Sequence, residues 1–324
     1  MKIGIIGAGA IAGTMARTVS KMKGAELCAI ASRDIKKAQD FAKEFKAKKA
    51  YGSYQELCDD SDVELVYIAT PHAFHAQQAE MCAKSGKPVL CEKAFTMNAG
   101  QAKKIAALFA EKKLYLAEAM WTRYMPSRKS IDQILQSGII GKVKALSANL
   151  SYSIESKERL VKPELAGGAL LDVGVYALNF SLMHFGHDIE RVESSVQMTA
   201  AGVDKNESIS LYYKDGRVAR LAAGMDARSD RKGIFWGEKG YVVVENINNP
   251  NLIQVFDSND KLLKRVKVPK QFSGYEYEVA EAIEKIKAGA IQSQSMPLDD
   301  SIFLMELMDR IRKDWGMVYP QERA

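Results

Sequence analysis

The hydrophobic residues in the first third of the chain fall into short, nearly unbroken runs that are separated by helix-prone stretches. Runs without polar alternation are typical of strands that are covered on both faces of a parallel sheet. We expect six such strands, at residues 3–6, 25–32, 50–51, 64–70, 87–91 and 114–119. Strands that alternate with helices in this way predict an α/β fold with a doubly wound parallel sheet, the Rossmann arrangement.

Two capping signals mark where helices begin between these strands. Ser53 and Glu56 have the spacing of a capping box, so a short helix is expected there. Asn98 is a favourable N-cap for a longer helix before the sixth strand. Both signals support the alternation of strands and helices.

The pattern changes beyond Trp121, where hairpins replace the alternation. Lys214-Asp215-Gly216 is a tight hairpin turn between two apolar runs. The expected strands are 142–154, 209–213, 218–222, 241–245 and 252–257, and the expected helices are 126–136, 275–287 and 298–315. This predicts a second, α+β domain with a large, open, mainly antiparallel sheet. We therefore expect two domains, residues 1–121 and 122–324.

The first predicted strand leads into a glycine-rich turn with the pattern GxGxxA. Gly7 allows a tight turn, Gly9 lets the backbone approach a pyrophosphate, and the small Ala12 lets the next helix pack on its strand. Ala10 and Ile11 lie in the same turn, at the positive end of the helix dipole. A tight turn without a ligand can have the same pattern. The complete strand–helix–strand unit favours a dinucleotide site.

The end of the second strand carries Ser32, Arg33 and Asp34, where such a unit contacts the ribose. A carboxylate at the strand end accepts hydrogen bonds from a ribose 2′-hydroxyl, whereas an arginine accommodates a 2′-phosphate. Because Ser32 and Arg33 come first, we predict NADP as the cofactor, with NAD less favoured. A shift of two positions would give the ribose to Asp34 and reverse that preference.

Composition and charge exclude several other classes of protein. The 324 residues are 47% hydrophobic and 27% charged, which is ordinary for a globular protein. The net charge of +6 lies on lysine-rich helix faces without interleaved aromatics, so no nucleic-acid partner is expected. No apolar run approaches the length of about 18 residues for a membrane span. Met1 leads directly into the first strand, so we expect a cytoplasmic protein with reduced cysteines.

The four histidines form two HxxH pairs, His72 with His75 and His184 with His187. Neither pair has a third ligand at a convincing spacing, and we therefore expect no metal site.

Polar residues at the carboxyl ends of the fourth and fifth strands are candidates for the ligand crevice. Thr70, Pro71 and His72 follow the fourth strand, and Glu92 and Lys93 follow the fifth. A lysine beside the nicotinamide can hydrogen-bond the reacting oxygen and act in proton transfer. The alternative is a charge pair in a surface loop.

A second candidate cluster follows Gly167 and Gly168, whose lack of side chains permits close backbone approach. Asp172 and Tyr176 are spaced i, i+4 on an otherwise apolar helix, so they share one face. Burying either group without a partner is unfavourable, which indicates a function. A neighbouring ammonium would favour the phenolate, so Lys93 and Tyr176 are expected to act as a pair. The alternative is a core tyrosine whose hydroxyl is satisfied.

Several motifs together resemble the Gfo/Idh/MocA oxidoreductase family, most of all its branch of dihydrodiol and NADP-linked D-xylose dehydrogenases. The motifs, in chain order, are GAGAIA, AIASRD, ATPHAFHAQQA, CEKAFTMN, EAMWTRYMP, GGALLDVGVYALN and MPLDDSIFLMELMDRIRKDWGMVYP. The resemblance implies a Rossmann domain, a C-terminal open sheet and NADP or NAD as hydride carrier. Ala94 stands where the family has proline.

The resemblance also assigns roles to individual residues. It implies that Lys93 is catalytic, that Tyr176 is the acid or base, and that Asp172 supports it. It places His75 in the cofactor crevice, and Trp121 and Arg123 beside the nicotinamide and substrate, where packing at a domain hinge is the alternative. Dimerisation or higher homo-oligomerisation through the C-terminal sheet is expected from the family.

Two functions remain in competition at this point. The first is an NADP-dependent dehydrogenase that acts on a hydroxyl-bearing carbon of an aldose or a cyclic trans-diol. The second is a noncatalytic NADP-binding sensor with the same fold. The presence of Lys93, Asp172 and Tyr176 together favours the enzyme. Arg159, in the second domain, indicates either an acidic ligand or a solvated loop charge.

Overall fold

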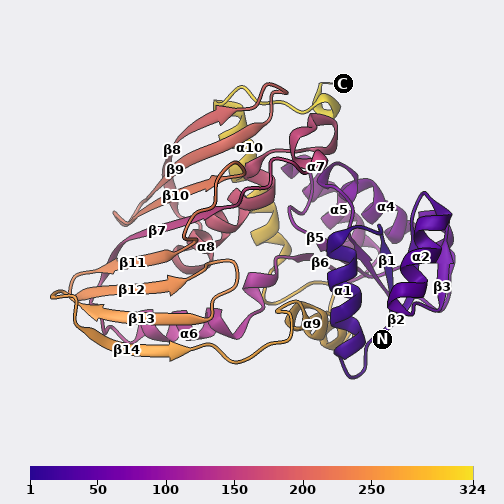
Figure 1. Ribbon diagram of the computed structural model, residues 1–324, viewed down its shortest axis with the longest axis horizontal. Coiled ribbons are helices and arrows are strands. Elements are labelled where there is room, and N and C mark those ends of the chain that lie inside the picture. Colours follow the sequence, from indigo (N-terminus) through magenta and orange to yellow (C-terminus); the bar gives the residue numbers. More distant parts are fainter. Residues whose placement is uncertain (324) are drawn as a thin grey trace. The chain divides into compact units, whose positions relative to one another are not determined.

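The computed structural model describes residues 1–323, which divide into two compact units (Figure 1). The first unit contains Met1–Tyr124 and Gln271–Met305, and the second contains Met125–Lys270 and the chain from Glu306 onward. The predicted boundary after residue 121 lies near the end of the first segment. Residues 271–305, which the sequence analysis assigned to the second domain, pack with the first unit. The division into functional domains at residue 121 stays a prediction.

The first unit contains a parallel sheet with the strand order β3-β2-β1-β4-β5-β6. Its strands are β1 (Lys2–Ile6), β2 (Glu26–Ala31), β3 (Lys49–Tyr51), β4 (Leu65–Ile68), β5 (Val89–Glu92) and β6 (Leu116–Ala119). Its helices are α1 (Ala10–Lys21), α2 (Ile35–Phe45), α3 (Tyr54–Asp59), α4 (His75–Lys84), α5 (Ala99–Glu111) and α9 (Glu276–Lys287). The order reverses between β1 and β4, as in a doubly wound fold, so the predicted fold class is confirmed.

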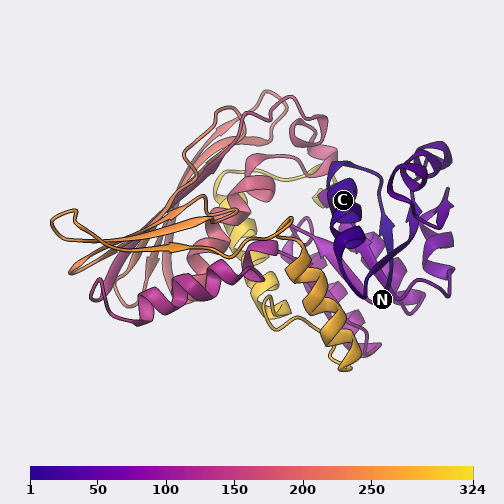
Figure 2. The same cartoon turned by 60° about the horizontal axis from the view of Figure 1, so that its bottom comes forward.

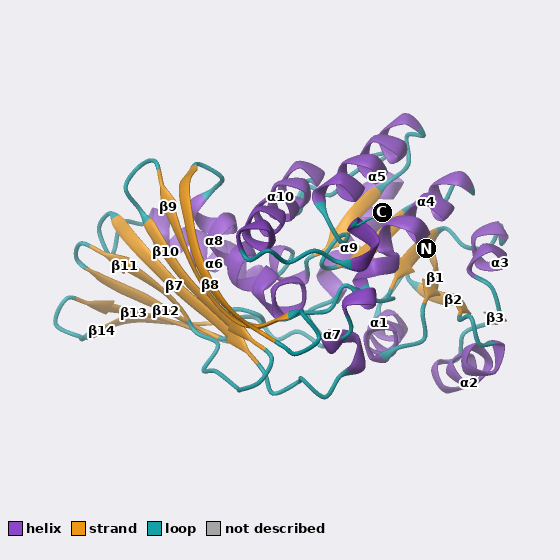
Figure 3. Ribbon diagram, turned by 90° about the horizontal axis from the view of Figure 1, so that it is seen from above, coloured by secondary structure: helices purple, strands orange, loops and turns teal. Residues whose placement is uncertain are grey.

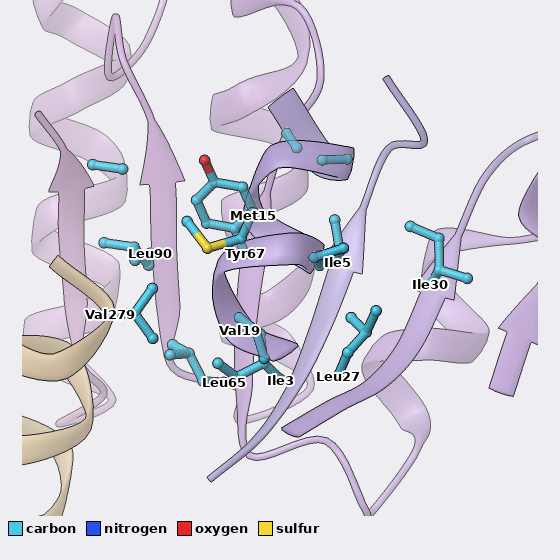
Figure 4. Close-up of a cluster of buried hydrophobic side chains, with 14 of the residues drawn as sticks. Ile3, Ile5, Met15, Val19, Leu27, Ile30, Leu65, Tyr67, Leu90 and Val279 are labelled. Carbon is cyan, nitrogen blue, oxygen red and sulfur yellow. The ribbon is translucent and has the colours of Figure 1, made fainter. Parts of the chain in front are cut away.

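The core of the first unit forms where apolar side chains from the sheet meet the helices (Figure 4). Ile3 and Ile5 of β1 are almost fully buried and lie against Met15 and Val19 of α1. Val279 of α9 joins the same cluster, although it is distant in the sequence. The strands of this sheet are unbroken apolar runs because helices cover both of its faces.

The two capping signals are confirmed. Glu56 accepts a hydrogen bond from the Ser53 backbone N–H, and the Ser53 hydroxyl caps the start of α3. The Asn98 side chain accepts from the Gln101 N–H at 2.9 Å at the start of α5.

The second unit contains a sheet with the order β14-β13-β12-β11-β7-β10-β9-β8. Its strands are β7 (Val143–Ser151), β8 (Ile189–Met198), β9 (Asp204–Tyr213), β10 (Val218–Gly224), β11 (Gly233–Gly237), β12 (Gly240–Glu245), β13 (Leu252–Asp257) and β14 (Leu262–Lys267). The β7–β10 pair is parallel and the other pairs are antiparallel. The predicted mainly antiparallel sheet and the hairpin at 214–216 are confirmed. The sequence analysis missed β8, β11 and β14; β14 in particular lacks a buried face, so it gives no apolar alternation.

Helices α6 (Pro126–Gln136) and α8 (Val175–Phe185) lie on one face of this sheet (Figures 2 and 3). Helix α8 packs against β7 and β10. The remaining helices of this part of the chain are α7 (Glu158–Val161) and α10 (Leu298–Asp314), whose second half belongs to this unit. The helical stretch Pro163–Phe185 is apolar and long enough to cross a membrane, a feature the sequence analysis did not single out, but 94% of its most apolar window is buried. Such burial is that of a core helix.

Burial opposes the ionisation of at least two carboxyls of the first unit, Glu118 and Glu278. Glu118 on β6 is 1% exposed, and burial raises its pKa to about 7 against weaker opposing effects of Ser301 and Arg123. Between the ordinary value of 4.5 and 7, the folded state holds a proton that the unfolded chain has lost. Stability therefore falls as the pH rises through this range.

We predict that Glu118→Gln removes the part of this pH dependence that Glu118 contributes. At pH 8 the variant should have a free energy of unfolding up to about 3 kcal/mol higher than that of the parent chain, with little difference at pH 4. Urea unfolding at the two pH values measures the effect, and Glu111→Gln, at an exposed position of α5, is the control. An unchanged pH profile in the Glu118 variant would contradict this account.

Candidate active site

The turn after β1 contains two glycines that the surrounding protein treats differently. Gly7 has φ +99°, and a Cβ there would lie 2.8 Å from the carbonyl oxygen of Ala69. Gly9 is the N-cap of α1, and a Cβ there would meet no atom within 4 Å among residues 1–323. Within the same range, no side chain caps α1 and no acidic residue lies in its first turn. Packing within the protein thus explains why residue 7 is glycine, but it does not explain the glycine at residue 9.

The end of β2 presents Ser32 and Arg33, while Asp34 is committed to a helix. The Asp34 carboxylate accepts hydrogen bonds from the backbone N–H groups of Lys36 at 2.9 Å and Lys37 at 3.3 Å, and so caps α2. Ser32 Oγ accepts from the Asp34 N–H. The exposed Arg33 has its guanidinium 5.5 Å from the Phe74 ring centroid. Arg33 is therefore the charged side chain that this strand end presents outward.

His75, at the start of α4, connects two loops. Its Nε2 lies 2.8 Å from the Thr70 carbonyl oxygen, and its Nδ1 lies 2.9 Å from that of Ala94. The side chain is fully buried, and this burial lowers the pKa of His75, which favours the neutral ring. The buried His72 packs edge-on against it, with ring centroids 5.8 Å apart. Both ring nitrogens of His75 face backbone carbonyl oxygens, so the ring links the loop after β4 to the loop after β5.

Glu92 is the last residue of β5, and Lys93 begins the loop that follows. Glu92 is buried and accepts a hydrogen bond from the Tyr67 hydroxyl. Burial, together with the charge of Glu92, raises the pKa of Tyr67 well above its usual value, so the phenol stays a donor. Lys93 is partly exposed at the same strand end, and the Lys93–Ala94 peptide bond is cis.

Trp121 and Arg123, which follow β6, are anchored within the first unit. The Trp121 ring stacks on Tyr275, with centroids 4.3 Å apart and planes inclined by 8°. Arg123 Nη1 lies 2.6 Å from Asp300 Oδ2, and the guanidinium is almost fully buried. The expected contact of both residues with a cofactor stays a prediction.

The predicted residues of the first unit share one feature of topology. They follow the carboxyl ends of five parallel strands: Gly7, Gly9, Ala10 and Ile11 after β1, Ser32 and Arg33 after β2, Thr70, Pro71, His72 and His75 after β4, Glu92 and Lys93 at β5, and Trp121 and Arg123 after β6. Carboxyl ends of parallel strands lie at one edge of a sheet, which is where open α/β sheets bind ligands.

The second unit carries Asp172 on a π-helical turn, Leu170–Gly174, that continues into α8. The sequence analysis expected an α-helix here; the i→i+5 bonds of the π turn widen it. Asp172 is 6% exposed and Tyr176 is 7% exposed. The Arg159 guanidinium binds both oxygens of the Asp172 carboxylate, at 3.0 and 3.2 Å.

This pairing bears on the role of Arg159, which the sequence analysis left open between an acidic ligand and a solvated loop charge. A bidentate arginine fixes the orientation of a carboxylate. Arg159 therefore has an acidic partner within its own unit.

The sequence analysis missed two carboxyls beneath this turn, Asp204 and Glu207. Both are buried at the start of β9. The signal was present, because Glu207 takes the position of an apolar residue in the inward series that continues with Ile209, Leu211 and Tyr213.

Metal-ligating residues do not cluster in the described part of the chain. Among residues 1–323, no group of three or more His, Cys, Asp or Glu side chains is placed to hold a metal ion. His184 Nδ1 lies 2.8 Å from Asp132 Oδ1, so that histidine pairs with a carboxylate.

Known proteins resemble both halves of the chain. Residues 1–119 match an oxidoreductase family with an NAD-binding Rossmann fold, and residues 129–243 match the GFO/IDH/MocA C-terminal domain. The trans-1,2-dihydrobenzene-1,2-diol dehydrogenase of Xenopus tropicalis is 33% identical over 98% of this chain and 99% of its own length. The human protein of that name is 29% identical over 100% of this chain and 99% of its own.

Solved structures share the fold over nearly the whole chain. A 3-ketoreductase from Actinomadura kijaniata, in complex with NADP and TDP-benzene, has a TM-score of 0.89 at 24% identity, with 97% of each chain covered. An aldose-aldose oxidoreductase from Caulobacter crescentus, complexed with glycerol, has a TM-score of 0.88 at 18% identity, with 98% of this chain and 99% of that chain covered. The matched domains and the full-length relatives agree: this chain belongs to the Gfo/Idh/MocA family of NAD(P)-dependent oxidoreductases.

Proposed function

We propose that this chain is an NADP-dependent dehydrogenase that transfers a hydride between the nicotinamide and a hydroxyl-bearing carbon of a sugar or cyclic trans-diol. The observation that carries the proposal is the sheet edge of the first unit. There the open helix start after β1 and the amine-bearing loop after β5 belong to the same row of strand ends. This is the arrangement that a dinucleotide with a reactive ring at one end requires.

The start of α1 supports binding of the cofactor pyrophosphate. A helix begins with backbone N–H groups that have no partner within the helix, and these groups favour an anion. At α1, no described side chain takes this role, and the positions of Gly9 and Ala10 are exposed. Because protein packing leaves room for a side chain at residue 9, a close ligand is the simplest reason for glycine there.

The end of β2 supports the choice of NADP. A ribose 2′-hydroxyl would need a carboxylate acceptor at this position. Asp34 caps α2 through Oδ1, which accepts from two backbone N–H groups, whereas the guanidinium of Arg33 is exposed and can pair with a 2′-phosphate. The solved 3-ketoreductase, which contains NADP, has the same fold.

For the chemical step we propose Lys93, Tyr176 and Asp172 as catalytic residues. The nicotinamide supplies the hydride acceptor or donor. In the oxidative direction, Tyr176 receives the hydroxyl proton as the carbon loses its hydride and becomes a carbonyl. The Lys93 ammonium favours the phenolate that this requires. Asp172, which Arg159 orients, supports Tyr176 from the preceding π turn of the same helical segment. The convergence of Lys93 and Tyr176 stays a prediction.

The names of the relatives guide the class of substrate. The curated relatives are dihydrodiol dehydrogenases, and the structural neighbours include an aldose-aldose oxidoreductase. We therefore propose a polyol or sugar with adjacent hydroxyl groups. We also propose a cytoplasmic homodimer or higher homo-oligomer formed through the C-terminal sheet, where Met198, Trp236, Leu262 and Leu263 expose 37–44% of their surface.

We predict that Lys93→Met and Tyr176→Phe each lower kcat by about 10²–10⁴-fold, because each removes a group that acts in proton transfer. Binding of NADPH should change less than about threefold, since the pyrophosphate and ribose contacts remain. Turnover is measured by NADPH absorbance with a panel of aldoses, inositols and trans-diols, and binding by fluorescence titration.

Parental turnover in the Lys93→Met variant would refute its role. Tight NADPH binding by the parent chain without turnover of any panel member would instead favour the noncatalytic sensor.

We predict that Arg33→Ala lowers kcat/KM for NADP⁺ by about 10–100-fold, the effect of losing a charge-assisted bond to phosphate. The value for NAD⁺ should stay within about threefold, because NAD⁺ has no 2′-phosphate. Steady-state kinetics with both cofactors measures the ratio. Lys36→Ala, which removes a neighbouring charge on α2, is the control. A parental preference for NAD⁺ would overturn the choice of cofactor.

We predict that substitutions at the two turn glycines have different effects. Gly9→Ala should raise the Kd for NADPH at least about tenfold, because its Cβ would meet the ligand, and lower the free energy of unfolding by no more than about 1 kcal/mol, the cost of alanine at an N-cap. Gly7→Ala should destabilise the fold by about 2 kcal/mol, because its backbone angle and the Ala69 carbonyl both oppose a side chain. Thermal unfolding and NADPH titration separate the two effects. Equal losses of stability would contradict the distinction.

A further inference from the structure

Two carboxyl side chains lie in the interior of the second unit, under the π turn. Asp204 and Glu207, at the start of β9, are 0% and 3% exposed. The inward positions that follow on this strand are apolar, so Glu207 interrupts a hydrophobic face. A buried carboxyl is unfavourable unless it is paired or hydrogen-bonded, and its retention calls for a specific partner.

Each of the two carboxyls is the partner of the other. Burial, the adjacent charge of Asp204 and a hydrogen bond between the two side chains raise the pKa of Glu207 well above its usual value. Neighbouring carboxyls cannot both ionise in a buried site, so the pair retains one proton. Because the pKa of Glu207 is the more strongly raised, we assign the shared proton to Glu207, with the Asp204 carboxylate as its acceptor.

The Asp204 carboxylate also contacts the start of the helical segment 170–176, which bears Asp172 and Tyr176. Its Oδ2 accepts a hydrogen bond of 2.5 Å from the backbone N–H of Leu170, the first residue of the π turn. The first N–H groups of a helical segment lack partners within it, and a negative charge there is stabilising. A residue on β9 thus satisfies the start of the helical segment that bears Asp172 and Tyr176.

Glycines allow this close approach. A Cβ at Gly168 would lie 2.0 Å from Asp204 Oδ1, and a Cβ at Gly174 would lie 2.0 Å from Glu207 Oε1. The Tyr319 hydroxyl donates to the Gly167 carbonyl oxygen at 2.7 Å, just before the turn. The carboxyl pair therefore contacts both ends of the π turn, and a third side chain holds the chain that enters it.

We infer that Asp204 and Glu207 are positioning residues that fix the register of residues 170–176, and thereby the orientation of Asp172 and Tyr176. This inference rests on the proposed function, which makes Tyr176 the proton acceptor. Leu170 is two residues before Asp172, so a shift at the start of the turn is transmitted directly to that carboxylate. Catalysis is sensitive to displacements of about 1 Å in a reacting group.

The test compares Glu207→Ala with Glu207→Gln. Alanine removes the donor to Asp204, whereas the glutamine amide can still donate to it. We expect Glu207→Ala to lower kcat at least about tenfold with the KM for NADP⁺ within about twofold, and Glu207→Gln to stay within about threefold of the parent. Hydrogen exchange of a peptide covering residues 168–176, measured by mass spectrometry below the Tm, should be faster in Glu207→Ala alone.

Ile209→Ala is the matched control, because it truncates the next inward side chain of β9 and leaves both carboxyls in place. The inference is overturned if Glu207→Ala leaves exchange of this peptide unchanged, or if Ile209→Ala accelerates it equally. It is also overturned if an active parent enzyme keeps its kcat in Glu207→Ala. A parent without turnover on any substrate, together with faster exchange in Glu207→Ala, would refute the proposed function and support the anchoring of the turn.

Discussion

The backbone N–H groups at the start of a helix have no partner within that helix, and the way each start is satisfied organises this protein. Asp34 satisfies the start of α2, and Asp204 satisfies the start of the segment that leads into α8. The start of α1 has no side-chain cap, which it shares with α4 and α6, and it alone among these follows the glycine turn after β1. We expect a phosphate at the start of α1, whereas the start of the segment 170–176 is held by Asp204. The same backbone chemistry is therefore proposed to bind a ligand in one unit and to position candidate residues in the other.

Different positions of this chain require glycine for different physical reasons. Gly7 is required by a nearby carbonyl and a positive φ, and Gly168 and Gly174 are required by the oxygens of a buried carboxyl pair. Gly9 has no such neighbour among the described residues. A glycine motif in a sequence is thus a mixture of packing and binding requirements. Gly9 has neither a positive φ nor, among the described residues, an atom within 4 Å of where a Cβ would lie, so we expect a ligand as its neighbour.

Much of the fold could be predicted from local sequence patterns, because apolar runs and capping residues determine where strands and helices form. The apolar runs of the first unit became parallel strands, and Ser53 and Asn98 cap the predicted helices. Strand β14 was missed because its residues are mostly exposed, so it carries no apolar alternation to detect. The π turn was missed because its residues have the composition of an ordinary buried helix. The association of residues 271–305 with the first unit depends on contacts that no local pattern encodes.

The sequence by itself determined the fold class, the family and the strand ends that bear the candidate residues, because periodicity and motif order are local properties. Only the tertiary structure decided how individual side chains are used. It gave Asp34 to the cap of α2, paired Arg159 with Asp172, and placed His75 between two backbone carbonyls. The physical reason is that a charge or a ring nitrogen is committed by whichever group lies within hydrogen-bond distance. That group can be two residues away, as for Asp34, or nineteen, as for His75 and Ala94, and the sequence alone does not show which group it will be.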